Sequence, residues 1–107
     1  MKKDQDVSKI KQFIHQVIPY KKEIIFFGSR TRGDFTDESD FDILIIVHRE
    51  NIERRKLTAF QSKIKRLCAK AGLDADIIVR DRHYTEEMKN FPGNIIHSVL
   101  QTGVPIQ

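Results

Sequence analysis

Three aspartates at the starts of apolar runs are the residues of this chain best suited to chemistry. Asp40 and Asp42 open the run over residues 43–47, and Asp76 precedes residues 77–79. In a strand, Asp40 and Asp42 project from one face with roughly 6.5 Å of rise between them, so both can reach one divalent cation. Mg²⁺ prefers such oxygen ligands. The alternative is a pair of solvated acids in a turn, where aspartate is common.

A second polar stretch has the composition of a phosphate-binding turn. Gly28 and Ser29 directly follow the apolar residues 24–27. Glycine lets the backbone turn sharply and approach a ligand, and serine offers a hydroxyl and an N–H to phosphate oxygens. Arg30 and Arg32 follow, where a guanidinium either neutralises phosphate charge or lies at the surface. The turn lacks the Lys-Ser/Thr ending of a P-loop and the three spaced glycines of a dinucleotide fold.

Both motifs lie in one stretch, GSRTRGDFTDESDFDILIIV, over residues 28–47. It resembles the signature of the polymerase-beta-like nucleotidyltransferases, and its GSRxRG form is most similar to their minimal nucleotidyltransferase group. The resemblance implies an enzyme that uses Mg²⁺, with two ions expected, to transfer AMP from ATP to a hydroxyl. It assigns Asp40, Asp42 and Asp76 to catalysis and metal binding, and Gly28, Ser29, Arg30 and Arg32 to the nucleotide phosphates.

The third carboxylate has two candidates in the expected strand over residues 73–79. Asp74 and Asp76 have the same parity there, so spacing alone does not choose between them. The family pattern, an Asp followed by two or three apolar residues, matches Asp76. On its separate strand, Asp76 is also placed to act as the base for the attacking hydroxyl. Whether Asp74 contributes stays open.

The resemblance also bears on the acceptor of AMP. Larger relatives carry another domain that helps to bind the base and the acceptor, and a single domain over residues 1–107 leaves little material for either. We therefore expect an oligomer or a hetero-complex in which a second chain completes the pocket. Minimal nucleotidyltransferases are often encoded beside HEPN-domain ribonucleases and act as their antitoxins. Some of them transfer AMP to a tyrosine of the toxin, so adenylylation of a HEPN partner is the predicted reaction.

Two other functions are compatible with the same residues. In one, the domain is a non-catalytic antitoxin that occludes a HEPN ribonuclease. In the other, it is a nucleotidyltransferase that acts on RNA or on a small hydroxylated molecule. Eight basic residues against two glutamates between Arg49 and Lys70 favour RNA slightly. A solvated helix face or a protein-docking surface explains such a run more often, so nucleic acid is not the favoured partner.

Composition places the chain among folded globular proteins, with 39% hydrophobic and 32% charged residues. No apolar run approaches the length of a membrane span and no apolar signal segment opens the sequence, so a cytoplasmic protein without membrane contact is expected. The single cysteine, Cys68, excludes an internal disulfide and falls on an apolar helical stripe, which predicts a buried structural thiol. The formal charge of +4 favours an anionic partner.

The periodicity of apolar residues predicts an α/β (α+β) fold, a small mixed β-sheet of three or more strands flanked by helices. Asn51 is expected to cap the middle helix, which Gly72 ends. A polar segment follows Arg80, in which Tyr84 is expected to be packed or solvated rather than catalytic. The expected helices cover residues 6–18, 51–72 and 91–103, the strands cover residues 23–27, 42–47 and 73–79, and a tail follows over residues 104–107.

Overall fold

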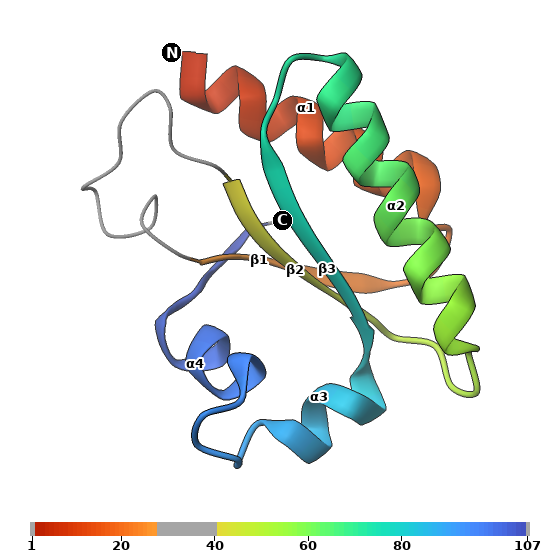
Figure 1. Cartoon of the computed structure of the whole chain (residues 1–107), viewed down its shortest axis with the longest axis vertical. Helices are drawn as coiled ribbons and strands as arrows, with labels where there is room; N and C mark the ends of the chain where they lie inside the picture. The colour runs from red at the N-terminus through yellow and green to blue at the C-terminus, as the bar shows by residue number, and fades with distance from the viewer. Residues whose placement is uncertain (1, 28–40, 107) are drawn as a thin grey trace.

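The computed structural model describes residues 2–27 and 41–106, which form a four-stranded mixed sheet with helices on both faces (Figure 1). The strand order is β3-β2-β1-β4. Strand β2 runs parallel to β3, and β1 runs antiparallel to both β2 and β4. The predicted fold class is therefore confirmed. The elements are α1 (Lys2–Val17), β1 (Lys22–Phe27), β2 (Phe41–Val47), α2 (Arg54–Lys70), β3 (Ala75–Asp81), α3 (Arg82–Met88), α4 (Ile95–Thr102) and β4 (Val104–Ile106).

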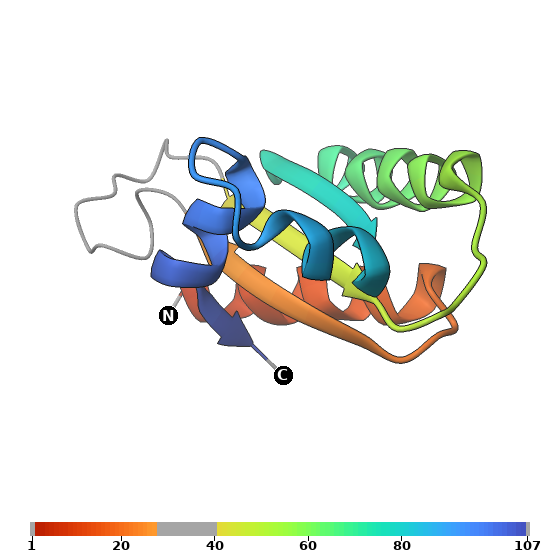
Figure 2. The same ribbon diagram turned by 90° about the horizontal axis from the view of Figure 1, so that it is seen from below.

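The sheet separates two apolar layers of unequal size. Helices α1 and α2 cover one face, and α3 and α4 cover the other; Figure 2 shows α3 and α4 in front of the strands and α1 behind them. The larger core joins Ile10 and Ile14 of α1 with Ile64 of α2 and with alternate residues of the strands. The smaller core joins Leu44 and Ile46 of β2 with buried residues of β1 and α4.

Strand β2 is the centre of the fold because it is buried on both faces. Ile43, Ile45 and Val47 point into the larger core, whereas Leu44 and Ile46 point into the smaller one. A strand covered on both sides needs apolar residues at both parities. The continuous apolar run over residues 43–47 is typical of a central strand of this kind, and β2 is one.

The start of α2 differs from the prediction. Asn51 does not cap the helix; its φ is 58°, a left-handed conformation that asparagine tolerates better than most residues, and it forms part of the turn before the helix. Glu53 is the N-cap instead, and its side chain forms no cap hydrogen bond. Asparagine favours both caps and left-handed turns, which is why composition alone misplaced it.

The end of α2 follows the prediction and explains where β3 begins. Gly72 has a φ of +77°, and its N–H donates to the carbonyl of Ala69 at 3.0 Å. The N–H of Leu73 donates to the carbonyl of Cys68 at 2.9 Å. These two bonds form a Schellman motif, which ties Leu73 to the helix. Strand β3 therefore begins two residues later than predicted, at Ala75.

The polar segment after Arg80 is helical, which the prediction missed. Asp81 caps α3, because its Oδ1 accepts the N–H of Tyr84 at 2.7 Å. Tyr84 packs against the smaller core, as the packed alternative predicted. His83 lies on the same short helix and forms an ion pair with Glu87 when protonated. Both residues are therefore held on a helix.

The last helix is shorter than predicted, and the tail adds to the sheet. Asn94 caps α4 by accepting the N–H of Ile96 at 2.8 Å, so Phe91 lies outside the helix with 58% of its surface exposed. Gly103 ends α4 in close contact with β1, where a Cβ would lie 3.0 Å from the carbonyl oxygen of Phe26. Within the expected tail, Val104–Ile106 forms β4, which pairs antiparallel with β1.

Each of the two edge strands of the sheet, β3 and β4, has a backbone position without a free N–H group. The N–H of Val79 in β3 donates to the side-chain oxygen of Gln61 in α2 at 3.1 Å. Strand β4 has only three residues, and Pro105 among them has no N–H to donate. Among the described residues, no helix has the length and apolarity needed to cross a membrane.

Cys68 is expected to resist thiol reagents in the folded protein. It is fully buried, and burial raises the pKa of its thiol, which lowers the fraction of reactive thiolate. Alkylation by iodoacetamide at mildly alkaline pH should be at least about 100-fold slower in the native protein than in urea-unfolded protein. Mass spectrometry of timed samples measures both rates. Equal rates would show that Cys68 is not a core residue.

Candidate active site

Asp42 and Asp76 stand directly opposite each other on neighbouring parallel strands. They lie near the starts of β2 and β3, on the face of the sheet that also carries Leu44 and Ile46. Paired residues on adjacent strands are about 4.8 Å apart and point the same way. The fold therefore brings together two of the three predicted carboxylates, which are separated by α2 in the sequence.

Asp42 is the more enclosed of the two carboxylates. It is partly buried, and its partner on the other side is Phe27, the last residue of β1. On the opposite face, the rings of Phe26 and Phe41 pack with their centroids 5.9 Å apart. These contacts hold the end of β1 against the start of β2, so they fix the place of Asp42 in the sheet.

Asp76 is open to solvent and has a cationic neighbour. Its side chain is 63% exposed, and its Oδ1 lies 3.9 Å from the Nζ of Lys65 on α2. An exposed ion pair of this length is weak and screened by salt. Lys65 therefore supplies a nearby positive charge without closing the site. Sequence reasoning missed it, because the pairing depends on how α2 packs beside β3.

Asp74 takes a different place from Asp76. It precedes β3, and its side chain is exposed. Its carbonyl oxygen accepts the N–H of Phe41 at 3.0 Å, so its backbone helps to align the starts of β2 and β3. The register pairs Asp42 with Asp76 and not with Asp74. The structure therefore separates two residues that spacing alone left equivalent.

The described helices leave this end of the sheet accessible. Helix α3 follows directly from the far end of β3, so it packs away from the strand starts, and α4 lies beneath β1 (Figure 1). Phe27 and Phe41 flank the predicted phosphate-binding stretch, and both lie at the end of the sheet that carries Asp42. The predicted site residues Gly28, Ser29, Arg30, Arg32 and Asp40 lie outside the described residues.

The donor set fits a hard divalent cation. Two carboxylates on one face, at the separation of paired strands, offer only oxygen ligands, which Mg²⁺ and Ca²⁺ prefer over softer metals. Over residues 2–27 and 41–106, no group of three or more potential metal-ligating side chains occurs. Asp42 and Asp76 can therefore hold a metal only with further ligands from the nucleotide, from water or from Asp40. Their assignment as metal ligands stays a prediction.

Comparison with known proteins assigns the class. Residues 7–97 match the model of the family described as "Nucleotidyltransferase domain". The chain belongs to the nucleotidyltransferase domain family. The predicted enzyme class is thus confirmed, and membership implies a nucleotide substrate and a divalent metal. The carboxylate pair of this nucleotidyltransferase lies within the matched residues, on strands β2 and β3.

Three known proteins are similar to this nucleotidyltransferase. A Methanocaldococcus jannaschii protein named "Putative protein adenylyltransferase" is 29% identical over 101 residues, 94% of each chain. A second protein of that organism with the same description is 68% identical over 25 residues, 23% of this chain and 25% of its own. A Sulfolobus solfataricus crystal structure described as "a putative nucleotidyltransferase" has a TM-score of 0.59 at 23% identity, covering 95% of this chain and 82% of that one. The structural similarity to the Sulfolobus solfataricus protein confirms the predicted fold.

Proposed function

We propose that this nucleotidyltransferase transfers AMP from ATP to a hydroxyl group of a partner protein. The direct pairing of Asp42 with Asp76 at an accessible end of the sheet carries the proposal. It places two carboxylates side by side in a chain that belongs to the nucleotidyltransferase domain family. The Methanocaldococcus jannaschii relative, matched over 94% of both chains, is named for protein adenylylation and so supports a protein acceptor.

The proposed reaction is a displacement at phosphorus. The acceptor oxygen attacks the α-phosphorus of ATP, and the bond from that phosphorus to the α–β bridging oxygen breaks. Pyrophosphate leaves with the electrons of the broken bond. The proton of the acceptor hydroxyl passes to Asp76, whose exposed carboxylate can then release it to water. The products are an adenylylated partner and pyrophosphate.

Asp42 and Asp76, with Asp40, would hold the metal of this reaction. Two Mg²⁺ ions bound there would offset the negative charge of the triphosphate and of the departing pyrophosphate. The rigid pairing of β2 with β3 fixes the spacing of Asp42 and Asp76 before substrate arrives, so little reorganisation is needed on binding. Gly28 and Ser29 would cradle the β- and γ-phosphates, and Arg30 or Arg32 would neutralise charge that develops during transfer.

The partner is proposed to be a HEPN-domain protein, with one of its tyrosines as the acceptor. Two features support a second chain at the site. The carboxylate of Asp76 is open to solvent rather than enclosed, and the described helices do not cover the strand starts. We propose that residues 1–107 act as a single domain and that the partner supplies the missing wall of the pocket.

The proposed function is tested with radiolabelled ATP. The purified chain is incubated with ATP labelled on the α-phosphate, Mg²⁺ and the purified product of a neighbouring HEPN gene. Label should enter the neighbour, with release of pyrophosphate, and chelation of Mg²⁺ should prevent it. Mass spectrometry should find an AMP group on a tyrosine of the neighbour. Tight binding of the two proteins without any labelling would favour the occluding antitoxin and contradict the proposal.

A further inference from the structure

Helix α2 carries a concentration of positive charge that the proposed reaction does not use. Its 17 residues contain no acidic side chain. All of its basic side chains are exposed, and together they are called the α2 basic face. At 1.5 Å of rise per residue the helix is about 25 Å long. The α2 basic face consists of Arg54, Arg55, Lys56, Lys63, Lys65, Arg66 and Lys70.

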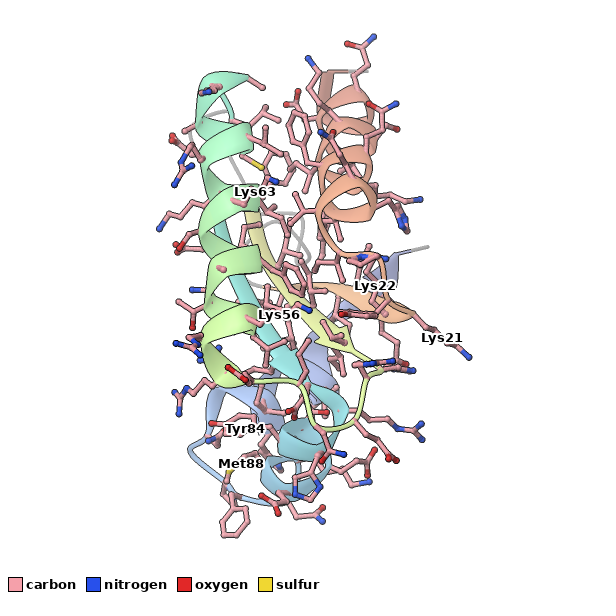
Figure 3. All side chains as sticks on the ribbon, turned by 90° about the vertical axis from the view of Figure 1, so that its right-hand side faces the viewer. Lys21, Lys22, Lys56, Lys63, Tyr84 and Met88 are labelled. Atoms are coloured by element: carbon pink, nitrogen blue, oxygen red, sulfur yellow. The ribbon has the colours of Figure 1, made fainter. Side chains whose placement is uncertain are left out.

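The α2 basic face lies on the side of the sheet opposite to the carboxylates. Helix α2 packs on the larger core through Leu57, Ile64 and Cys68, whereas Asp42 and Asp76 share the face of the smaller core. Figure 3 shows the side of the molecule that carries α2. Lys56 and Lys63 of α2 are labelled there, together with Lys22 of β1 and Lys21 in the turn before β1. Apart from Lys65, whose Nζ lies 3.9 Å from the Oδ1 of Asp76, the charge of α2 therefore lies outside the candidate active site.

Arg55 and Lys65 of α2 have acidic neighbours, but the cations at Lys63, Arg66 and Lys70 are uncompensated within the described residues. Arg66 precedes Lys70 by four residues and follows Lys63 by three, and like charges at these spacings repel one another on a helix. Among the described residues, these three side chains form no ion pair. A solvated helix face usually mixes charges of both signs. A bound polyanion would relieve the repulsion along α2.

The composition of the face favours nucleic acid over a protein partner. The other exposed residues of α2 are small, and they comprise Thr58, Ala59, Ser62 and Ala69. Protein interfaces have an apolar or aromatic centre and are depleted of lysine. Interfaces with nucleic acid are more polar and much more positively charged. Small residues between the cations would let a phosphate backbone come close to the helix.

An aromatic residue extends the face at its N-terminal end. The Nζ of Lys56 donates to the hydroxyl of Tyr20 at 2.9 Å, which lowers the pKa of that hydroxyl. The guanidinium carbon of Arg49 lies 5.2 Å from the centre of the Tyr20 ring. The ring is partly exposed and packs edge-on against Phe60. A partly exposed aromatic beside a row of cations is typical of surfaces that bind single strands.

We propose that the α2 basic face binds the phosphate backbone of a single-stranded nucleic acid, with Tyr20 contacting a base at one end. The contacts are mainly electrostatic, so binding depends little on sequence and strongly on salt. Apart from Lys65, which pairs with Asp76 at its edge, this surface is separate from the proposed AMP-transfer site. The nucleotidyltransferase therefore has two anion-binding surfaces, one on each side of its sheet.

The test is fluorescence anisotropy with a labelled single-stranded RNA of about 20 nucleotides, with a duplex of the same length for comparison. With four phosphate contacts, the affinity for the single strand should fall roughly 50-fold between about 50 and 200 mM salt. Lys63→Glu/Arg66→Glu should weaken binding by at least about tenfold and reduce the salt slope by about 1.4, the share of two contacts to a single strand. Circular dichroism checks that this variant keeps its helices.

A matched variant controls for net charge. Arg82→Glu/Lys89→Glu, at the two ends of α3, changes the formal charge by the same amount on the other side of the sheet, and it should bind RNA nearly as the wild type does. ATP binding should be unchanged in the α2 variant. Four results would each overturn the proposal. Two concern RNA alone, namely no binding at low salt and equal weakening by both variants. The other two are tighter binding of the duplex than of the single strand, and an affinity for polyglutamate equal to that for RNA. The last result would indicate an acidic protein surface as the partner.

Discussion

Replacing Asp42 or Asp76 by asparagine is expected to reduce AMP transfer by a factor of at least about 1,000. Asparagine keeps the size of the side chain and removes its charge, so the strands should stay in place. The two residues are directly paired, and both variants should therefore lose the same metal-dependent step. Initial rates of label transfer from ATP at saturating Mg²⁺ measure the loss.

Asp74→Asn is the matched control for this prediction. Asp74 lies two residues from Asp76, precedes β3 and contributes its backbone carbonyl to the sheet, which asparagine retains. Its activity should stay within about twofold of the wild type, because a surface substitution of this kind changes little. Calorimetric titration of ATP with and without Mg²⁺ separates binding from chemistry. Full activity in Asp42→Asn, or a loss in Asp74→Asn equal to that in Asp76→Asn, would reject the assigned carboxylates.

The largest expected effect on stability is at the centre of the sheet. Ile45 is fully buried in the larger core and is paired with Ile24 on one side and Val79 on the other. Ile45→Ala should lower the free energy of unfolding by about 2–5 kcal/mol, since it removes buried methyl groups and leaves a cavity. Small domains are stable by about 5–15 kcal/mol in total, so the loss is a large share. Urea unfolding followed by circular dichroism measures it.

Two further substitutions calibrate the result for Ile45. Ile45→Val removes one methylene group and should cost only about 0.5–1.5 kcal/mol. Leu100→Ala, at a side chain that is 40% exposed on α4, should cost less than Ile45→Ala. A shift in the urea midpoint for Ile45→Ala no larger than that for Leu100→Ala would contradict the packing of β2 between two apolar layers.

The sequence was most informative where periodicity and composition agree. The apolar run over residues 43–47 indicates a strand buried on both faces, because such a strand needs apolar residues at both parities. Asp42 and Leu44 have the same parity in this run, and strand geometry places them on one face. The left-handed Gly72 marked the end of α2 correctly.

The sequence was least informative where tertiary packing decides. The pairing of Asp42 with Asp76 depends on the register between strands separated by a whole helix, which local pattern does not specify. Helix α3 has little apolar periodicity, and its main signal is the cap at Asp81. Lys65 is close to Asp76 only because α2 crosses beside β3.

The bond between Val79 and Gln61 affects how this protein associates with others. Strand β3 is an edge strand of the sheet, and the unpaired N–H groups of an edge strand can bind strands of other chains. The side chain of Gln61 accepts one of these N–H groups. At the other edge, β4 is short and Pro105 has no N–H to donate, so β4 is a poor template for a further strand. Both edges of the sheet therefore disfavour aggregation by strand addition. Association with a partner should therefore proceed through side-chain surfaces rather than through a continuous intermolecular sheet.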